Sequence, residues 1–484
     1  MKKLGIVVIC LFTVAQLYGQ NSIDWAVAFQ GLSLNVTDMV EHPDGGVVAI
    51  GIKQELSYSR ISPVMKHSNG ETHKSRALLS NRSGSFVIRL DAKGKLLYSN
   101  VIGKDIDVLG VSIVSNGNAI LLCELSYYNN YYHDREFANL FPEEDEVNDG
   151  FYFVTLNNSG QFIHQNQLSE IDSDADIDVT SFQKHPDGGF IIGGHCESAK
   201  LLTDDEASGF RGGGDFVMMC SVEGQINWSD VVSYRTNSCC SYAGEGNCVS
   251  VAPDGTIYMG GTYFVGGIFS NGLHTLAVSD LTKKNDRPEE TYIVSYTVKG
   301  KINWVKTSLN SARFHRLAAT DKGVYVGFKT NQTMIFERQI SQTEDWNTVL
   351  GFISKKGQTK WMNVEQVLRF DQMKINNDGD LVVCGEAKRK YPDTKASQIA
   401  GMVLNDKDDT FIAQVSKNGK GISLASLTLW ASSERMQLLY TATGEIYFGA
   451  EIWCGLSISL EKLNTMFPDV TCYGGSQIIG KLEP

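Results

Sequence analysis

The chain of 484 residues carries 43 lysines and arginines against 55 aspartates and glutamates, a formal net charge of −12 at pH 7. This acidic balance excludes nucleic acid and anionic membranes as expected partners, because either needs a basic face. Forty-seven glycines, nine prolines and 10% aromatic residues fit a turn-rich all-β protein. No long apolar stretch has helical periodicity, so we expect helices to be incidental.

The N-terminus has the layout of a secretory signal peptide. Lys2 and Lys3 precede an apolar run, Leu4–Leu17, which small and polar residues follow. The run is too short to span a bilayer comfortably. We therefore predict a signal peptide over residues 1–20 and an exported mature chain with no integral membrane segment. The expected location is the periplasm, the cell surface or the exterior of a bacterium.

Ten cysteines are present, of which nine follow the signal segment. Cys239, Cys240 and Cys248 lie close together in the sequence, as do Cys454 and Cys472. Export to an oxidising compartment predicts disulfide bonds within these two loops, with Cys240, Cys248, Cys454 and Cys472 as the favoured partners. Zinc is disfavoured, because no Cys-x-x-Cys pair occurs and no histidine stands at zinc spacing from the cysteines.

The chain is organised around a unit of four short β-strands, best seen between residues 178 and 232. The unit comprises Asp178–His185, Phe190–His195, Asp215–Ser221 and Gln225–Val232. An Asp-Gly pair links the first two strands, which predicts a hairpin with a type I′ turn. A four-strand unit repeated in series is typical of a β-propeller.

The turns of this unit recur along the whole chain. Glycine-containing turns between first and second strands occur at Pro43–Gly46, Asn116–Gly117, Pro186–Gly189, Pro253–Gly255, Asp321–Gly323, Asp378–Gly379 and Thr443–Gly444. Turns between third and fourth strands occur at Gly94, Gly160, Gly224, Gly300, Gly357 and Gly419. The last unit lacks a fourth strand, whereas Ser22–Phe29 matches Gln225–Val232.

We therefore predict an all-β fold, a seven-bladed β-propeller of four-stranded antiparallel blades. The N-terminal strand, residues 21–30, completes the last blade and closes the ring, which removes exposed sheet edges. A single propeller domain then spans residues 21–484. Its blades are expected at about 34–102, 107–170, 177–234, 245–308, 314–366, 369–429 and 434–484.

A large, mostly aromatic side chain stands four residues after most of the turns between third and fourth strands. Examples are Tyr98, Trp228, Trp304 and Trp361. A fixed offset in successive copies predicts a shared packing position between adjacent blades.

All the long connections join a second strand to a third strand. In a four-stranded meander these connections leave from one face of the ring, while the tight turns lie on the other. Long loops on a rigid scaffold are where binding sites usually lie. We therefore place function on this face.

The repeat resembles bacterial seven-bladed β-propeller repeat proteins of the SBBP type. The resemblance is carried by Asp215-Phe216-Val217 through Trp228, by Pro186–Gly194, by Ser85–Tyr98 and by Thr410–Gly419. It implies an exported propeller with no common activity. Ile257–Gly261 together with Tyr292–Trp304 is also similar to quinoprotein-type repeats, which implies a quinone-cofactor enzyme as a further alternative.

The connection around residues 127–133 has the composition of a binding surface. We predict ligand-binding roles for Tyr127, Tyr128, Tyr131, Tyr132 and His133. Tyrosine supplies flat apolar area with a polar end, as carbohydrate-binding and protein-binding surfaces require. The alternative is that these tyrosines pack on neighbouring loops.

Four carboxylates at alternate positions offer a candidate metal site: Asp172, Asp174, Asp176 and Asp178. Hard oxygen ligands with this spacing can wrap a calcium ion. The alternative is a solvated acidic loop, because the glycine that tightens a calcium-binding loop is missing. We expect no other cofactor.

The sequence contains no nucleophile elbow, zinc-protease motif, phosphate-binding loop or dinucleotide-binding glycine pattern. We therefore expect a non-catalytic binding scaffold whose ligand is a surface glycan or an exported protein. The alternative is a secreted polysaccharide hydrolase or lyase that uses acidic residues of the same face.

Overall fold

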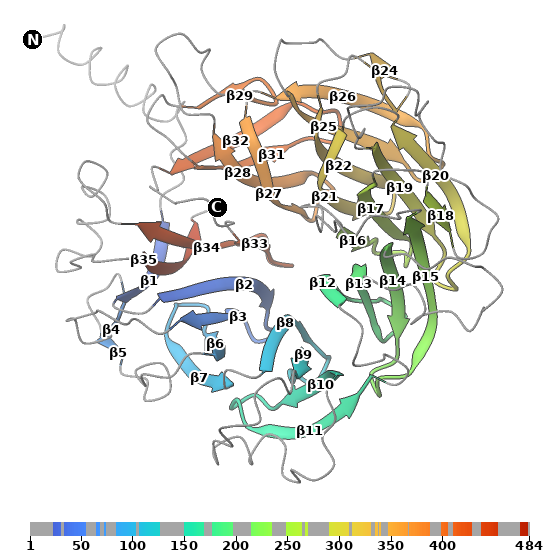
Figure 1. Ribbon diagram of the computed structural model, residues 1–484. Coiled ribbons are helices and arrows are strands. Elements are labelled where there is room, and N and C mark those ends of the chain that lie inside the picture. Colours follow the sequence, from blue (N-terminus) through green and yellow to red (C-terminus); the bar gives the residue numbers. More distant parts are fainter. Residues whose placement is uncertain are drawn as a thin grey trace, which may run out of the picture.

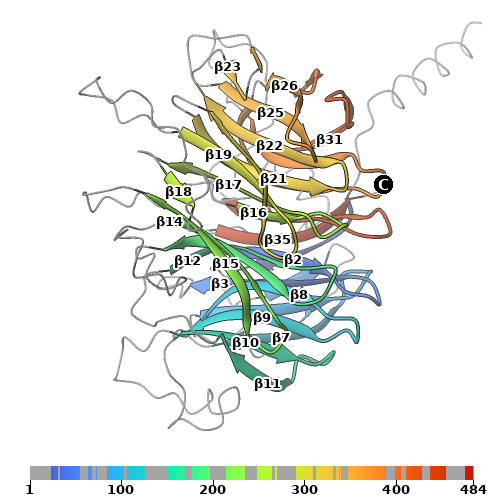
Figure 2. The ribbon, with the colours of Figure 1, turned by 90° about the vertical axis from the view of Figure 1, so that its right-hand side faces the viewer.

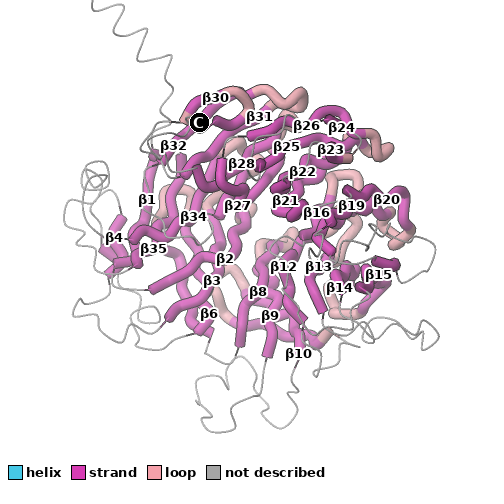
Figure 3. Tube along the Cα trace, turned by 45° about the horizontal axis from the view of Figure 1, so that its top comes forward, coloured by secondary structure: helices cyan, strands magenta, loops and turns pink. Residues whose placement is uncertain are grey.

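A computed structural model describes most of the repeat regions. The described residues are 23–30, 33–54, 64–67, 72–73, 84–102, 106–125, 150–168, 177–196, 214–234, 248–263, 267–269, 290–308, 312–330, 334–336, 338–339, 347–365, 367–387, 398–404, 410–427, 437–453 and 475–482. Within them the chain forms strands and turns and no helix (Figure 3). The predicted signal peptide lies outside these residues.

Six blades follow one another along the chain, each built on four antiparallel strands that pair in chain order. Blade 1 is β2 (Ser33–Glu41), β3 (Val47–Gln54), β6 (Gly84–Leu90) and β7 (Leu96–Ile102), and blade 2 is β8 (Ile106–Ile113), β9 (Ala119–Leu125), β10 (Gly150–Leu156) and β11 (Phe162–Gln167). Blade 3 is β12 (Ile177–Lys184), β13 (Phe190–Cys196), β14 (Gly214–Cys220) and β15 (Ile226–Tyr234), with β18 (Gly267–Phe269) added at its edge.

Blade 4 is β16 (Cys248–Val251), β17 (Ile257–Tyr263), β19 (Glu290–Tyr296) and β20 (Ile302–Ser308). Blade 5 is β21 (Ala312–Thr320), β22 (Gly323–Thr330), β25 (Asn347–Ser354) and β26 (Thr359–Glu365). Blade 6 is β27 (Val367–Ile375), β28 (Leu381–Ala387), β31 (Thr410–Val415) and β32 (Gly421–Leu427). Two small hairpins stand apart: β23 (Met334–Ile335) with β24 (Arg338–Gln339), and β29 (Gln398–Ile399) with β30 (Met402–Val403).

The remaining sheet is composite. Its order is β33 (Gln437–Tyr440), β34 (Ile446–Trp453), β35 (Gly475–Leu482), β1 (Ile23–Gln30), β4 (Val64–His67) and β5 (Thr72–His73). The prediction of seven equivalent four-stranded blades is thus wrong in this respect, since the described residues form five four-stranded blades, a sixth blade that β18 extends to five strands, and one six-stranded sheet. The cause is the edge of β1, which pairs with a strand from the connection that follows β3.

The composite sheet closes the ring, as Figure 1 shows. Strand β1 pairs antiparallel with β35, for example Val27 with Ile479, and Val27 is fully buried. The first strands of consecutive sheets are in contact around the centre, from β2 through β8, β12, β16, β21 and β27 to β33, which returns to β2. At the junction the Ala442 amide donates to Glu41 Oε2 over 2.7 Å.

The tight turns have glycine at the positions that the sequence indicates, but their geometry differs from the prediction. In the turn between β16 and β17, the Gly255 amide donates to Ala252 O over 2.9 Å and the Ala252 amide donates to Thr256 O over 2.8 Å. Within this turn only Gly255 has positive φ, at 80°. Three residues lie between the paired positions, so the loop is a type I turn followed by a glycine bulge and not a type I′ turn.

The repeated aromatic residues do pack between blades. A Cβ atom on Gly300 would lie 2.6 Å from the Trp228 ring, and the Trp228 indole N–H donates to Val298 O over 2.8 Å. Trp304 and Trp361 donate in the same way to Lys355 O and Lys417 O, both over 2.8 Å. Each tryptophan of a fourth strand therefore rests on the third-to-fourth turn of the next blade.

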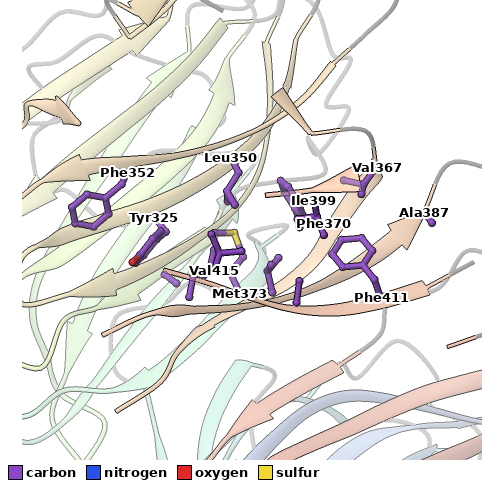
Figure 4. Packing of buried hydrophobic residues seen from close by; sticks show 14 of the residues in the cluster. Tyr325, Leu350, Phe352, Val367, Phe370, Met373, Ala387, Ile399, Phe411 and Val415 are labelled. Atoms are coloured by element: carbon purple, nitrogen blue, oxygen red, sulfur yellow. The ribbon is translucent and has the colours of Figure 1, made fainter. Parts of the chain in front are cut away.

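The core lies between blades. The third strands β6, β10 and β14 are buried along their whole length, while the fourth strand β11 has no buried residue. The cluster between blades 5 and 6 illustrates this packing (Figure 4): Tyr325, Leu350 and Phe352 of blade 5 lie against Phe370 and Phe411 of blade 6. Burial of apolar surface between neighbours thus holds the ring together.

Deletion of residues 23–30 tests ring closure. It removes a strand from the middle of the composite sheet and exposes backbone groups of β35 that β1 now pairs. We expect a clearly lower melting temperature, measured by circular dichroism. A truncated protein that melts like the intact chain would contradict closure by β1.

Replacement of Trp304 tests the contacts between turns. Trp304→Phe removes the indole donor to Lys355 O and should lower the free energy of unfolding by about 1 kcal/mol. Trp304→Ala also removes the ring that packs on Gly357, and should lower it by about 2–3 kcal/mol because the ring is only partly buried. Urea denaturation measures both, with the exposed turn variant Lys301→Ala as the control that should unfold like the parent chain.

Candidate functional site

The two faces of the ring carry different kinds of connection between strands. The tight turns gather on one side, seen in Figure 2, and the strand ends that carry the long connections lie on the other. We call the second side the loop-bearing face. First strands begin there and second strands end there, so paired residues at these ends meet near the centre of the ring.

At four blades the residue near the start of the first strand and its neighbour on the second strand are charged or titratable. Residues directly opposite on antiparallel strands point to the same face of a sheet. We call these side chains the inner rim: Asp107 with Glu124, Asp178 with His195, Arg313 with Lys329, and Arg369 with Glu386.

The rim is polarised by charge. Blades 2 and 3 contribute Asp107, Glu124 and Asp178, of which both aspartates are exposed. Blades 5 and 6 contribute the cations. Blade 4 separates the two halves on one side, and blade 1 with the composite sheet separates them on the other.

His195 is oriented by a buried carboxylate. Its Nδ1 lies 3.2 Å from Asp215 Oδ1, and the Tyr292 hydroxyl of the next blade donates to Asp215 Oδ2 over 2.6 Å. The side chain of Asp215 is 6% exposed and that of His195 is 14% exposed. With the Nδ1 proton held by a carboxylate, the Nε2 atom can accept a proton. The arrangement can therefore act as a positioned base.

The cationic half centres on an extra residue in strand β21. His315 has no partner on β22, because the register shifts between Phe314 and Arg316. Burial, together with repulsion from Arg316, Lys329, Arg369 and Arg313, lowers the pKa of His315 to about 3. The imidazole is therefore neutral at physiological pH, and the charge of this region comes from its four basic neighbours.

Two carboxylates face these cations. Arg369 Nε lies 2.9 Å from Asp371 Oδ1 and 3.4 Å from Glu386 Oε2. Asp371 is itself an extra residue, in strand β27, and its backbone oxygen accepts a 2.6 Å hydrogen bond from Arg316 Nε. Bulges of this kind often redirect side chains near functional sites.

Polar side chains one step further along the first strands have a structural role. Asp38 Oδ2 accepts from the Val111 amide over 3.3 Å, and Ser181 Oγ accepts from the Val249 amide over 2.9 Å. Each joins a first strand to the first strand of the next blade. Burial raises the pKa of Asp38, and attraction to Lys374 opposes that rise.

Most of the residues singled out from the sequence lie outside the described residues. These are Tyr127, Tyr128, Tyr131, Tyr132, His133, Asp172, Asp174, Asp176, Cys240, Cys454 and Cys472. Asp178 is described, and it is an exposed residue of strand β12. Among the described residues, no group of three or more histidine, cysteine or acidic side chains is placed to hold a metal ion.

Cys248 differs from the prediction, because it is a free thiol and not half of a disulfide. It is buried at the start of β16, and its sulfur accepts a hydrogen bond from the Leu317 amide over 3.2 Å. Burial raises the pKa of this thiol to about 11. Cys248 thus links blades 4 and 5, in the same way as Asp38 and Ser181 link their blades.

Sequence reasoning missed the inner rim. One available signal was the recurrence of charged residues two positions before the extra residue of a first strand, as at Asp107, Asp178, Arg313 and Arg369. The positions of those bulges were not evident from the strand pattern.

No protein-family model matches the chain, and no curated protein matches it. Among solved structures, one of streptogramin B lyase aligns over 95% of this chain and 98% of its own, with 10% identity and a TM-score of 0.40. The Dos1 propeller aligns over 94% and 93%, with 7% identity and a TM-score of 0.41. A europium-containing methanol dehydrogenase aligns over 92% and 93%, with 9% identity and a TM-score of 0.37.

These comparisons assign no activity, and the likeness to SBBP-type proteins stays a prediction. In the described part of the chain, no helix is long and apolar enough to cross a membrane.

Glu365, at the end of β26 on the loop-bearing face, makes stability depend on pH. Burial raises the pKa of Glu365 to about 7, although a 2.7 Å hydrogen bond from the Ala400 amide opposes the rise. An unfolded glutamate has a pKa of about 4.3. The folded state therefore binds the proton more tightly, and this group's contribution to stability is lost as the pH rises from about 4.3 to about 7.

Glu365→Gln should remove this fall in the free energy of unfolding between pH 5 and pH 8. At pH 8 it should raise the free energy of unfolding by on the order of 3 kcal/mol. Urea titrations at pH 5 and pH 8 measure the effect. Glu223→Gln, in an exposed turn, is the matched control and should keep the parent slope. An unchanged slope in Glu365→Gln would show that another group is responsible.

Proposed function

We propose that this protein is an exported, non-catalytic binding scaffold that holds a surface glycan or another exported protein on its loop-bearing face. The observation that carries the proposal is the difference between the two faces. On the tight-turn face, contacts between blades engage the side chains. The loop-bearing face carries the long connections and the polarised inner rim.

On the tight-turn face, side chains are engaged with the neighbouring blade. His185 Nε2 donates to Gly255 O over 3.1 Å, because its Nδ1 accepts from the Asp187 amide over 3.1 Å. Tyr325 donates to Gly379 O over 3.1 Å, and Asn377 donates to Ala442 O over 2.6 Å. These contacts repeat from blade to blade, as expected of a structural surface.

On the loop-bearing face, by contrast, charged side chains reach solvent at the strand ends. Asp107, Asp178 and Arg313 are exposed there. Solvated charges near the centre of a ring steer ligands and fix their orientation. Such residues add little to stability, since surface ion pairs contribute little. Ligand binding is the role that best accounts for their clustering.

A polysaccharide hydrolase or lyase is the alternative. The observation that favours it is the His195–Asp215 pair, a histidine held by a buried carboxylate near the loop-bearing end of blade 3. The cross-strand pair Asp107 and Glu124 supplies further carboxylates. Under this alternative, His195→Gln should abolish turnover of the polysaccharide. Under the binding proposal, His195→Gln still forms a stable complex with the polysaccharide, and neither the parent chain nor the variant turns it over.

Thermal denaturation of the mature protein against a panel of acidic and neutral polysaccharides tests the proposal. A ligand that binds only the folded state raises stability by about 2.7 kcal/mol at a hundredfold excess over Kd. The double variant Asp107→Arg, Asp178→Arg should change the Kd of a ligand so found by about tenfold or more, because it reverses two exposed charges on the loop-bearing face.

The control is Lys93→Glu, Lys301→Glu, which reverses two exposed charges on the tight turns and should bind like the parent. Loss of binding in the control, with retention in the rim variant, would place the binding site on the tight-turn face and contradict the proposal. If no polysaccharide stabilises the protein, the same variant pair is applied to partners captured from the exported fraction.

A further inference from the structure

The outer rim of the ring is formed by the fourth strands of the blades and by β1 of the composite sheet (Figure 1). The outer edge of such a strand carries backbone groups that can pair with a further strand. Two of these edges take a further strand from the same chain. Strand β4 pairs antiparallel with residues 27–30 of β1, and β18 pairs antiparallel with residues 232–234 of β15. The outer rim of this ring therefore accepts extended antiparallel strands.

The other five outer edges fall into two groups by charge. Strands β20 and β26 carry lysine, at Lys306 and Lys360. A lysine on an edge strand opposes pairing with another chain, because its charge would lose water against a second strand. Strands β7, β11 and β32 contain no lysine, arginine, aspartate or glutamate. The charge that protects an edge is thus missing from these three.

Each of the three uncharged strands exposes a large apolar side chain at the same place. Leu97, Ile163 and Ile422 stand three residues after the turn glycine, and they are 47%, 45% and 51% exposed. At the matching position, β20 and β26 have Asn303 and Lys360. An uncharged edge strand with an exposed apolar side chain is the kind that pairs with another chain.

Strand β11 is the most exposed of the three. None of its six residues, Phe162–Gln167, is buried. By contrast, β7 ends at the buried Ile102. The Gly421 amide at the start of β32 donates to Ala400 O over 3.0 Å, in the turn of the β29–β30 hairpin. The inner edge of β11 pairs with β10, and within the described residues no strand pairs with its outer edge.

We propose that the outer edge of β11 pairs antiparallel with β11 of a second copy of this chain, so that two blades form one continuous sheet. The inference goes beyond the proposed function, because it concerns the outer rim and not the loop-bearing face. A two-fold axis between the strands makes the contact isologous, with the same residues contributed by both copies.

The properties of β11 favour a second copy over a different partner. With a net charge of −12 two copies repel each other, and an uncharged edge lets them meet with no like charges opposite. Gln165, Asn166 and Gln167 each carry an amide donor and acceptor, so like side chains can hydrogen-bond across the axis. A second β11 is also ordered beforehand, so its pairing costs less conformational entropy than the ordering of a free peptide.

Sedimentation equilibrium of the mature protein over a concentration series tests the proposal. We expect the mass of two chains at high concentration and of one chain at low concentration. Hydrogen–deuterium exchange at the two ends of the series then locates the contact. Exchange should be slower in β11 at high concentration and unchanged in β20, whose edge carries Lys306.

Charged variants provide the second test. Ile163→Lys with Gln167→Lys places two charges at exposed positions of β11. In a two-fold pair the lysines of both copies meet, which should weaken the dimer by about tenfold or more. The control is Leu97→Lys with Ile422→Lys, which adds the same charge at exposed positions of β7 and β32 and should keep the parent affinity. Circular dichroism checks that both variants fold.

A protein that stays monomeric throughout the series would overturn the proposal. A dimer in which β11 exchanges as fast as in the monomer would also overturn it, and this result needs no variant to fold. So would a dimer that the control weakens as much as the β11 variant does. None of these results depends on a ligand at the loop-bearing face, so failure here leaves the proposed scaffold function intact.

Discussion

The spacing of the blades depends on one repeated interaction: a side chain of one blade donates a hydrogen bond to a turn carbonyl of the next. Trp228, Trp304 and Trp361 do so on the outer strands, and His185 does so nearer the centre. Each indole also covers the turn glycine, where a Cβ would collide with the ring or press against it. A propeller blade has little core of its own, so its stability comes from its neighbours. These contacts fix the spacing of blades on one face and leave the opposite face to vary.

On the loop-bearing face, the side chains at the strand ends differ from blade to blade. Its inner strands are joined by a second set of bonds, from Asp38, Ser181 and Cys248 to amides of the next blade. Just beyond these bonds, each strand end can present a different side chain without disturbing the ring. Acidic residues predominate on blades 2 and 3, whereas Arg313, Lys329 and Arg369 lie on blades 5 and 6, beside Glu386. The polarity of the rim is thus a property of the strand ends and is independent of the repeat.

The sequence predicted the parts of the fold that local chemistry determines. Glycines such as Gly300 and Gly357 mark turns because only they adopt positive φ readily. The match between residues 22–29 and a fourth strand predicted the pairing of β1 with β35. It did not predict β4 or β18, because strands of four and three residues within polar connections form only against a partner edge. The rim was missed since one extra residue, such as Leu109 or His315, changes which side chains share a face.

The central claim is that ligands meet the loop-bearing face while the tight-turn face is structural. Hydrogen–deuterium exchange of the mature protein, with and without a polysaccharide that stabilises it, tests this most directly. The account predicts slower exchange at the starts of β8, β12, β21 and β27 and unchanged exchange in the turns at Gly300 and Gly357. Protection confined to the tight turns, with none at the strand starts, would contradict it.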